Sequence, residues 1–401
     1  MSKASGVFQR CRPDCPARCK QHGWAFLVEV GRDHHGRRRQ ITRSGFGTAR
    51  QARQARELVL AQFRSGQLPT DRHQSTGEYL ERWYARKAGG GLVRPTTARS
   101  YRQHLDAYLL PHLGPVRLAD LRPAHIEAMY AAIQKSNASR ARPVGPATVR
   151  RIHATLSSAL RAAVKRGDLA HNPAQHVELP SADRPRVRPW DAATFGAFLD
   201  AIEGHRLAPL YHLTGTAGLR RGEACGLRWV DVDLDTAVLI VRQQVVQIGH
   251  RTAIGKPKTR SGEDRVVDLD AGTVAALRQW RASQAAERLA WGPAWHDSGL
   301  VFTREDGTGY HPQQVTKTFT RLARAAGVPA TRYHDLRHLQ ASLMLAAGVP
   351  LPVVSKRLGH SSITITADTY SHLLDGVGRQ AAEAAAALIP RRSSGGTLTI
   401  P

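Results

Sequence analysis

A proline-rich, charged stretch, HVELPSADRPRVRPW at residues 176–190, separates two parts of the chain whose sequence patterns differ. The stretch contains Pro180, Pro185 and Pro189, and its charges alternate in sign. Both features are typical of an interdomain linker. The 401 residues are enough for two or three domains, each with its own hydrophobic core. We therefore expect a multidomain chain.

The part before this linker is predicted to be wholly helical over residues 75–179. Segments such as TTARSYRQHLDAYLLPHLG and GPATVRRIHATLSSALRAAVKRG carry apolar residues at the spacing of amphipathic helices. Pro123 and Pro146 suit first helical turns, and Gly167 suits a helix end. The pattern indicates a compact bundle with basic exposed faces, suited to a DNA backbone; a bundle that binds a protein partner is the alternative.

The N-terminal part has a different pattern. Residues 24–47 alternate apolar and polar side chains around a turn rich in Gly and His, which predicts a β-hairpin. Residues 49–66 have helical periodicity and end at Gly66, a residue suited to a helix end. A small sheet with one helix and an Arg-rich surface would suit contact with phosphates. A basic ribbon without site preference is the alternative.

Positive charge dominates the composition. Lys and Arg number 58 against 32 Asp and Glu, which gives a net charge of +26. Such a field favours polyanions, usually nucleic acid. A GC-rich genome would raise the Arg count but would not by itself explain the shortage of acidic residues. No apolar run approaches the roughly 20 residues of a membrane span, and the N-terminus lacks the apolar core of a signal peptide. We therefore expect a cytoplasmic protein with no membrane partner.

Three of the four cysteines lie together with a histidine in CRPDCPARCKQH. These residues are Cys11, Cys15, Cys19 and His22. They are ligands that zinc prefers, although their spacing departs from the usual pairs separated by a long gap. A disulfide is not expected in a reducing compartment. A structural zinc ion is one interpretation of this segment. Cys225, in an apolar helical pattern, is predicted to be a small buried residue.

The part after the linker is expected to mix helices with short strands. Residues 236–248 and 263–270 are predicted strands that flank a turn at 249–262. Farther on, TRYHDLRHLQAS places His334, Arg337 and His338 on one face of a helix, beside a stripe of leucines. Taken alone, this cluster could be an ordinary polar surface.

Further segments contain groups that could act on a phosphate. In chain order, the candidate residues are Arg220, Lys258, His334, Arg337, His360 and Tyr370. Their surrounding boxes read AGLRRGE, HDLR, LGH and DTYSH. The boxes and their order resemble those of the tyrosine recombinases, the lambda-integrase-like site-specific recombinases of phages and mobile elements.

The resemblance implies a multidomain fold that is mostly α-helical with small β-sheets. Residues 1–66 would form a Cys-containing leader and an arm-type DNA-binding domain with a β-sheet and a helix. Residues 75–179 would form a helical, SAM-like core-binding domain, and residues 188–391 a mixed α+β catalytic domain.

The resemblance also implies a mechanism. Tyr370 is expected to attack the DNA phosphorus, which forms a 3′-phosphotyrosine and releases a 5′-hydroxyl. Arg220 and Arg337 are expected to bind the nonbridging oxygens, because a guanidinium matches phosphate bidentately and stays charged.

The other candidates are expected to move protons or to bind the phosphate. Lys258 would protonate the departing 5′-oxygen, with Lys256 in the same turn as the alternative. His334 would assist proton transfer at the tyrosine, and His360 would hydrogen-bond the phosphate. His338 is expected to support its neighbours without touching DNA. Glu223, one turn beyond Arg220, is expected to orient a basic neighbour and not to react.

The function implied is that of an integrase, which integrates and excises a mobile element such as a prophage. It would act on double-stranded attachment sites as a homotetramer, without a cofactor for catalysis; an excisionase or a host DNA-bending protein could assist it. A type IB topoisomerase, an inactive DNA-binding regulator of the same fold and a zinc hydrolase are the alternatives. The arm-like segment and the histidine boxes favour a recombinase, and the complete set of candidates argues against an inactive regulator.

Overall fold

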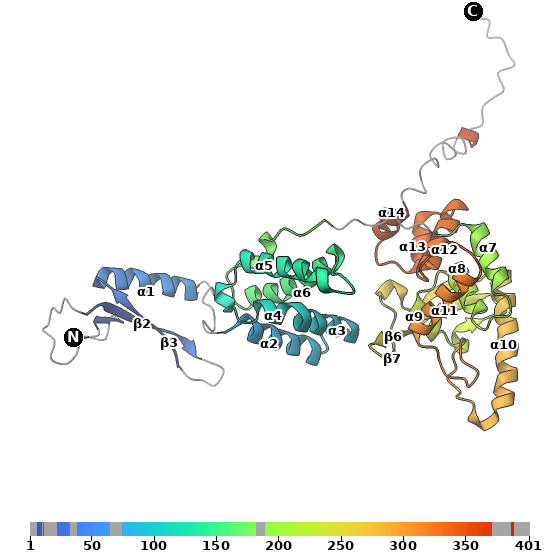
Figure 1. Ribbon diagram of the computed structural model, residues 1–401, viewed down its shortest axis with the longest axis horizontal. Coiled ribbons are helices and arrows are strands. Elements are labelled where there is room, and N and C mark those ends of the chain that lie inside the picture. Colours follow the sequence, from blue (N-terminus) through green and yellow to red (C-terminus); the bar gives the residue numbers. More distant parts are fainter. Residues whose placement is uncertain are drawn as a thin grey trace, which may run out of the picture. The chain divides into compact units, whose positions relative to one another are not determined.

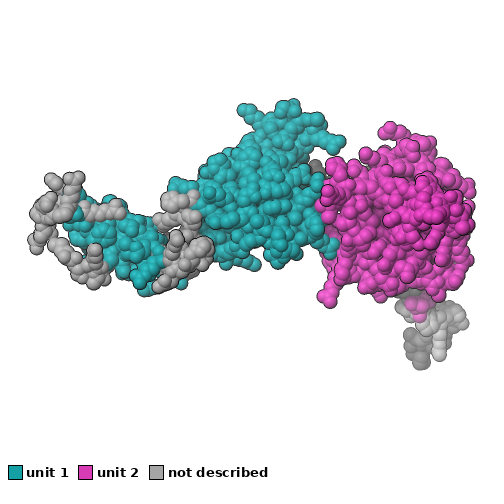
Figure 2. Space-filling view, turned by 90° about the horizontal axis from the view of Figure 1, so that it is seen from below, with its two compact units in different colours: residues 1–183 teal, residues 184–401 magenta. Residues whose placement is uncertain are grey.

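The computed structural model describes residues 6–9, 11, 22–32, 38–64, 74–181, 189–370 and 386–388. The chain divides into two compact units, a first unit of residues 1–183 and a second unit of residues 184–401 (Figures 1 and 2). The first unit contains two separate hydrophobic cores. The predicted fold class, mostly α-helical with small β-sheets, is confirmed. None of the helices in these ranges is long and apolar enough to span a membrane.

The N-terminal part of the first unit is an antiparallel sheet in the order β1-β2-β3 with one helix beside it (Figure 1). Its elements are β1 (Val7–Gln9), β2 (Trp24–Arg32), β3 (Arg38–Phe46) and α1 (Ala49–Arg64). Phe26 and Val28 point from β2 to one face and are buried with Val59 of α1. The predicted hairpin and helix are confirmed, and β1 was not predicted. The hairpin turn and the predicted helix end at Gly66 lie outside the described residues.

The helical bundle predicted over residues 75–179 is also confirmed. It contains α2 (Thr76–Gly89), α3 (Pro95–His104), a π-helical turn (Leu105–Leu109), α4 (Leu110–Leu113), α5 (Pro123–Lys135) and α6 (Pro146–Lys165), with short 3-10 turns at Leu118–Asp120, Ser136–Ser139 and Pro173–His176. Ser75 starts α2 because its hydroxyl accepts the backbone N–H of Glu78, whose carboxylate accepts that of Ser75. Pro123 and Pro146 occupy first helical positions, as predicted.

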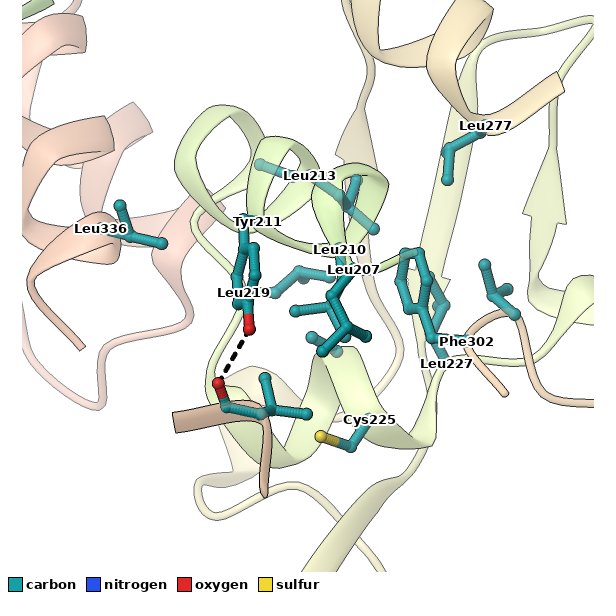
Figure 3. Close-up of a cluster of buried hydrophobic side chains, with 14 of the residues drawn as sticks. Leu207, Leu210, Tyr211, Leu213, Leu219, Cys225, Leu227, Leu277, Phe302 and Leu336 are labelled. Atoms are coloured by element: carbon teal, nitrogen blue, oxygen red, sulfur yellow. Dashed lines mark hydrogen bonds between the residues drawn. The ribbon is translucent and has the colours of Figure 1, made fainter. Parts of the chain in front are cut away.

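The second unit packs its helices around α8, which contacts α10 and α12. Its helices are α7 (Ala192–Ala201), α8 (Ala208–Ala217), α9 (Arg221–Gly226), α10 (Ala271–Trp291), α11 (Pro312–Ala325), α12 (Asp335–Ala346), α13 (Leu351–Leu358) and α14 (Ile363–Tyr370). Figure 3 shows Leu210 and Tyr211 of α8 in the core, with Leu336 of α12 nearby. The Tyr211 hydroxyl donates to the carbonyl of Val315 at 2.9 Å, so this buried polar atom is satisfied. Cys225 is buried, as predicted.

The strands of the second unit differ from the prediction. They are β4 (Val232–Asp233), β5 (Val238–Val241), β6 (Gln244–Ile248), β7 (Arg251–Gly255) and β8 (Arg265–Asp268). The predicted strand 236–248 is two strands, since β5 pairs with β8 while β6 pairs with β7. The predicted turn at 249–262 contains β7. Lys258 therefore follows a strand and does not lie at a hairpin tip.

Candidate active site

Arg220 lies immediately before α9 and is held by the carboxylate of Glu223. The backbone N–H of Arg220 donates to Glu223 Oε2 at 2.8 Å, and Arg220 Nη1 donates to Oε1 at 2.8 Å. Nη2 donates to the carbonyl of Gly359, also at 2.8 Å. A single carboxylate thus fixes both the main chain and the side chain of Arg220 where the helix begins.

Glu223 in turn forms a buried ion pair with Arg265 of β8. The pair is bidentate, with Nη1–Oε1 at 3.0 Å and Nη2–Oε2 at 2.7 Å, and the two residues are 1% and 6% exposed. Burial alone would raise the pKa of Glu223, but the hydrogen bonds and charges of Arg265 and Arg220 outweigh it and lower the pKa to about 2. Glu223 therefore stays ionised and keeps Arg220 in place.

Arg337 lies in the first turn of α12 and is 3% exposed. Nη1 donates to the carbonyl of Gly218 at 2.6 Å, and Nη2 donates to the carbonyl of Leu358. Burial, together with the charge of Arg220, lowers the pKa of Arg337 to about 9, so it remains a cation at neutral pH. A guanidinium has five N–H donors. Donors are left on both arginines to bind a phosphate oxygen.

The turn after α13 brings the two arginines together. Leu358 and Gly359 are consecutive, and their carbonyls accept from Arg337 and Arg220 respectively. Gly359 has a φ of +66°, and a Cβ there would lie 3.1 Å from the Cα of Gly262. A side chain at this position would be strained and crowded, so glycine lets the turn approach close enough to present both carbonyls.

His334 and His360 lie within the influence of the same arginines. Loss of hydration and the charges of His338 and Arg337 lower the pKa of His334 to about 4, although the residue as a whole is exposed. Burial and the charges of Arg337 and Arg220 lower the pKa of His360 to about 4. Nδ1 of His360 lies 2.8 Å from the Thr366 hydroxyl, which orients the ring. Both imidazoles are therefore neutral at pH 7 and can each donate one N–H.

Tyr370 ends α14 and is 2% exposed. Its hydroxyl lies 2.6 Å from Nδ1 of His338, on the helix that carries Arg337. Burial raises the pKa of Tyr370, and the charge of Arg337 opposes that shift. The phenol is thus protonated at neutral pH and needs a partner to take its proton during any attack.

Lys258 is the candidate that the structure does not bring into contact with the others. Its side chain is exposed, in the segment between β7 and β8. The segment itself is attached to the site, because the Thr259 hydroxyl donates to the carbonyl of Gly359 at 3.1 Å and the Ser261 hydroxyl to that of His360 at 2.9 Å. Lys256 lies 3.8 Å from the carboxylate of Glu263.

The structure therefore brings Arg220, Arg337, His334, His360 and Tyr370 together in one site. Sequence analysis expected Glu223 to orient a basic neighbour and His338 to support its neighbours, and these two residues contact Arg220 and Tyr370 respectively. It did not assign Arg265, which pairs with Glu223. The position of Glu223 three residues after Arg220 in a helical pattern was an available signal, since a carboxylate there caps the helix start. Nothing local marks Arg265.

The predicted zinc ligands lie mostly outside the described part of the chain. Cys11 and His22 are described, whereas Cys15 and Cys19 are not. Within the described ranges, no group of three or more His, Cys, Asp or Glu residues is placed to hold a metal ion. The zinc interpretation therefore stays a prediction.

A cluster of arginines and neutral histidines beside a buried tyrosine can bind a phosphate group and offer it a nucleophile. Residues 192–376 match the family described as Phage integrase family, and residues 77–179 match its companion, Phage integrase central domain. The chain belongs to this family of tyrosine recombinases.

Known proteins resemble most of the chain. A "Tyrosine recombinase XerC-like" protein of Caldanaerobacter subterraneus subsp. tengcongensis is 27% identical over 368 residues, which cover 86% of this chain and 91% of that protein. A prophage phiRv2 integrase of Mycobacterium tuberculosis is 27% identical over 310 residues, 76% of each chain. The Tn1549 transposon integrase in complex with transposon right end DNA has the same fold, with a TM-score of 0.65 at 20% identity over 77% of this chain and 99% of that one.

Proposed function

We propose that this protein is a site-specific recombinase that cuts and rejoins double-stranded attachment sites through a 3′-phosphotyrosine at Tyr370. It integrates and excises a mobile element such as a prophage. The observation that carries the proposal is the buried hydroxyl of Tyr370 at the edge of a site formed by Arg220 and Arg337. The similarity to transposon and prophage integrases supports the choice of a mobile element as substrate.

In the proposed reaction the arginines bind the scissile phosphate. Each uses two N–H groups on protein acceptors and has others to offer the nonbridging oxygens. His334 and His360, neutral at pH 7, add hydrogen-bond donors without extra charge. Preorganised donors of this kind stabilise the charge that develops on the phosphate by several kcal/mol each, roughly.

Lys258 is the proposed general acid that protonates the 5′-oxygen as it leaves. Two observations favour it over Lys256: Thr259, its neighbour, is bonded to the same carbonyl as Arg220, and Lys256 lies beside a carboxylate. The amine of Lys258 is exposed, so it can contact DNA whose phosphate is bound at the arginines. No cofactor is needed in this scheme, because the arginines and the lysine supply positive charge and the phosphotyrosine bond retains the energy for rejoining.

The protein is proposed to act in the cytoplasm as a homotetramer on DNA, because recombination joins two duplexes and needs a nucleophile for each strand. A lambda integrase tetramer bound to a Holliday junction has the same fold, with a TM-score of 0.51 at 18% identity, which supports this assembly. The net charge of +26 suits a polyanionic partner. An excisionase or a host DNA-bending protein would set the direction of the reaction.

Tyr370→Phe is expected to abolish covalent attachment to DNA while leaving binding intact, because only the nucleophilic oxygen is removed. The measurement uses the attachment region beside the gene, nicked so that the cleaved strand is trapped, and a denaturing gel that separates protein–DNA adducts. Tyr211→Phe is the matched control, since that hydroxyl is buried in the core and bonded to a carbonyl. Binding without any wild-type adduct would favour the DNA-binding regulator; an adduct without exchange between duplexes would favour a topoisomerase.

We also propose that one structural zinc ion is held by Cys11, Cys15, Cys19 and His22. The ion would stabilise the leader and take no part in catalysis. The purified full chain is then expected to contain about one zinc per protomer by elemental analysis, in line with the four-ligand sites that zinc occupies. Cys15→Ser should lose the metal, and Cys225→Ser, which changes a buried cysteine outside the cluster, should retain it. A wild-type protein purified without zinc chelators and free of zinc would disprove the site.

A further inference from the structure

We propose that His338 is a catalytic residue, which accepts the proton of the Tyr370 hydroxyl as that oxygen attacks the phosphorus. The proposal rests on the proposed function, in which Tyr370 is the nucleophile. It changes the expected role of His338, which sequence analysis treated as a supporting residue, and moves the proton transfer away from His334.

The geometry singles out His338. Its Nδ1 lies 2.6 Å from the Tyr370 hydroxyl, within the distance over which a general base takes a proton directly. The two ring centroids are 5.8 Å apart. The ring of His334 instead meets the ring of His338 edge-on, with centroids 5.2 Å apart. His338 thus lies between His334 and the nucleophile.

The protonation state of His338 suits this role. Burial lowers its pKa, and the charges of Arg337 and Arg332 act in the same direction while that of Asp335 opposes them. The ring is therefore neutral at pH 7, and a neutral imidazole that carries its hydrogen on Nε2 presents a lone pair on Nδ1. The buried phenol is the hydrogen-bond donor in this arrangement.

The proton must move during the attack and not before it, because burial raises the pKa of Tyr370 and lowers that of His338. As the tyrosine oxygen forms its bond to phosphorus, its O–H bond breaks and the proton passes to Nδ1. The bond from phosphorus to the 5′-oxygen breaks, and its electron pair leaves with that oxygen, which takes a proton from Lys258. In the rejoining step His338 returns its proton to the tyrosine oxygen.

A purely positioning role for His338 is the competing explanation, and His338→Asn separates the two. The amide oxygen of asparagine can take the place of Nδ1 and accept the hydrogen bond, but it is not a base. We expect His338→Asn to lower the single-turnover rate of adduct formation by about 10²–10⁴-fold, the usual contribution of a general base. DNA affinity and the melting temperature should match wild type; His338→Gln replaces this variant if it does not fold.

A DNA substrate with sulfur in place of the bridging 5′-oxygen identifies the step that fails. A thiolate leaves without protonation, because the pKa of a thiol is far below that of an alcohol. The substrate should therefore restore cleavage by Lys258→Ala but not by His338→Asn. His205→Asn is the matched control: this histidine of the second unit accepts a backbone N–H at 3.0 Å and should cleave both substrates normally.

Two results would overturn the assignment: a His338→Asn rate within about threefold of wild type, far from the loss a general base gives, or rescue of that variant by the sulfur substrate. The wild-type adduct and its loss in Tyr370→Phe are measured in the same assay. If wild type forms no adduct, or if Tyr370→Phe still forms one, the proposed function itself is disproved. If wild type forms a normal adduct and His338→Asn is also active, only the role of His338 is disproved.

Discussion

Arg265→Met is expected to lower the free energy of unfolding of the second unit by about 3 kcal/mol and to slow cleavage, because Glu223, which holds Arg220, loses its other charged partner. Removal of one partner of a buried ion pair leaves an incompletely compensated charge, which typically costs about 3–5 kcal/mol. The lower end applies because Arg220 still contacts Glu223. Calorimetry of the full chain should show that the melting temperature of one transition falls by about 6–12 °C, given the size of this unit.

Two further variants separate stability from activity. Arg278→Met removes a surface arginine that bonds the carbonyl of Leu234 and the carboxylate of Asp235, so it should cost under about 1 kcal/mol. The double variant Glu223→Met with Arg265→Met removes both buried charges and should recover most of the stability. It should be inactive, because Arg220 then has no carboxylate to hold it. An active double variant would show that this carboxylate does not position Arg220.

The pH dependence gives a second measure of the same pair. The pKa of Glu223 is lowered from its ordinary value of 4.5 to about 2, so its contribution to stability is present above pH 4.5. That contribution is lost as the pH falls through the folded-state pKa. The difference in stability between wild type and Arg265→Met should be largest at neutral pH and should shrink as the pH falls from 4.5 toward 2.

Arg337→Lys is expected to lower the rate of adduct formation by about 10²–10³-fold, the usual effect of removing one preorganised donor. A lysine ammonium cannot contact the carbonyls of Gly218 and Leu358 and a phosphate oxygen in the flat geometry of a guanidinium. Burial at this position would also favour loss of the lysine proton. DNA affinity should change little, because one phosphate contact is a small part of a large basic surface.

The measurement is a single-turnover assay on the nicked attachment site, with affinity determined separately at the same salt concentration. Arg228→Lys is the control, since this partly buried arginine pairs with the buried carboxylate of Asp231 in the same unit. A wild-type cleavage rate for Arg337→Lys would mean that the phosphate does not bind the buried guanidinium.

The site residues could be predicted because the chemistry restricts which residue types can serve. Phosphate transfer to a tyrosine needs permanent cations and proton carriers, and the short boxes that contain them occur in the order typical of the family. Arg337 is an example: it is buried in α12 between Leu336 and Leu339, a position where an uncompensated charge is rare. The sequence pattern also predicted α12, which carries Arg337, and a helical pattern around Cys225, where α9 begins directly after Arg220.

What could not be predicted depends on partners that are distant in the chain. Arg265 pairs with a carboxylate 42 residues earlier, and no local pattern marks that contact. Strand β7 escaped prediction because its side chains are nearly all exposed, so it lacks the alternation of a half-buried strand. The contact between His338 and Tyr370 spans 32 residues and depends on how α13 packs against both α12 and α14.

The turn at Leu358 and Gly359 also determines when the chain becomes able to cut. Its carbonyls accept from Arg337, on α12, and from Arg220, before α9, so the two guanidinium groups are held as a pair only once α13 has packed against its neighbours. A newly synthesised or partly unfolded chain keeps its full positive charge and can still adhere to DNA. It has no matched pair of arginines, however, and therefore cannot nick the chromosome that it touches. Completion of the fold is thus a safeguard against stray breaks.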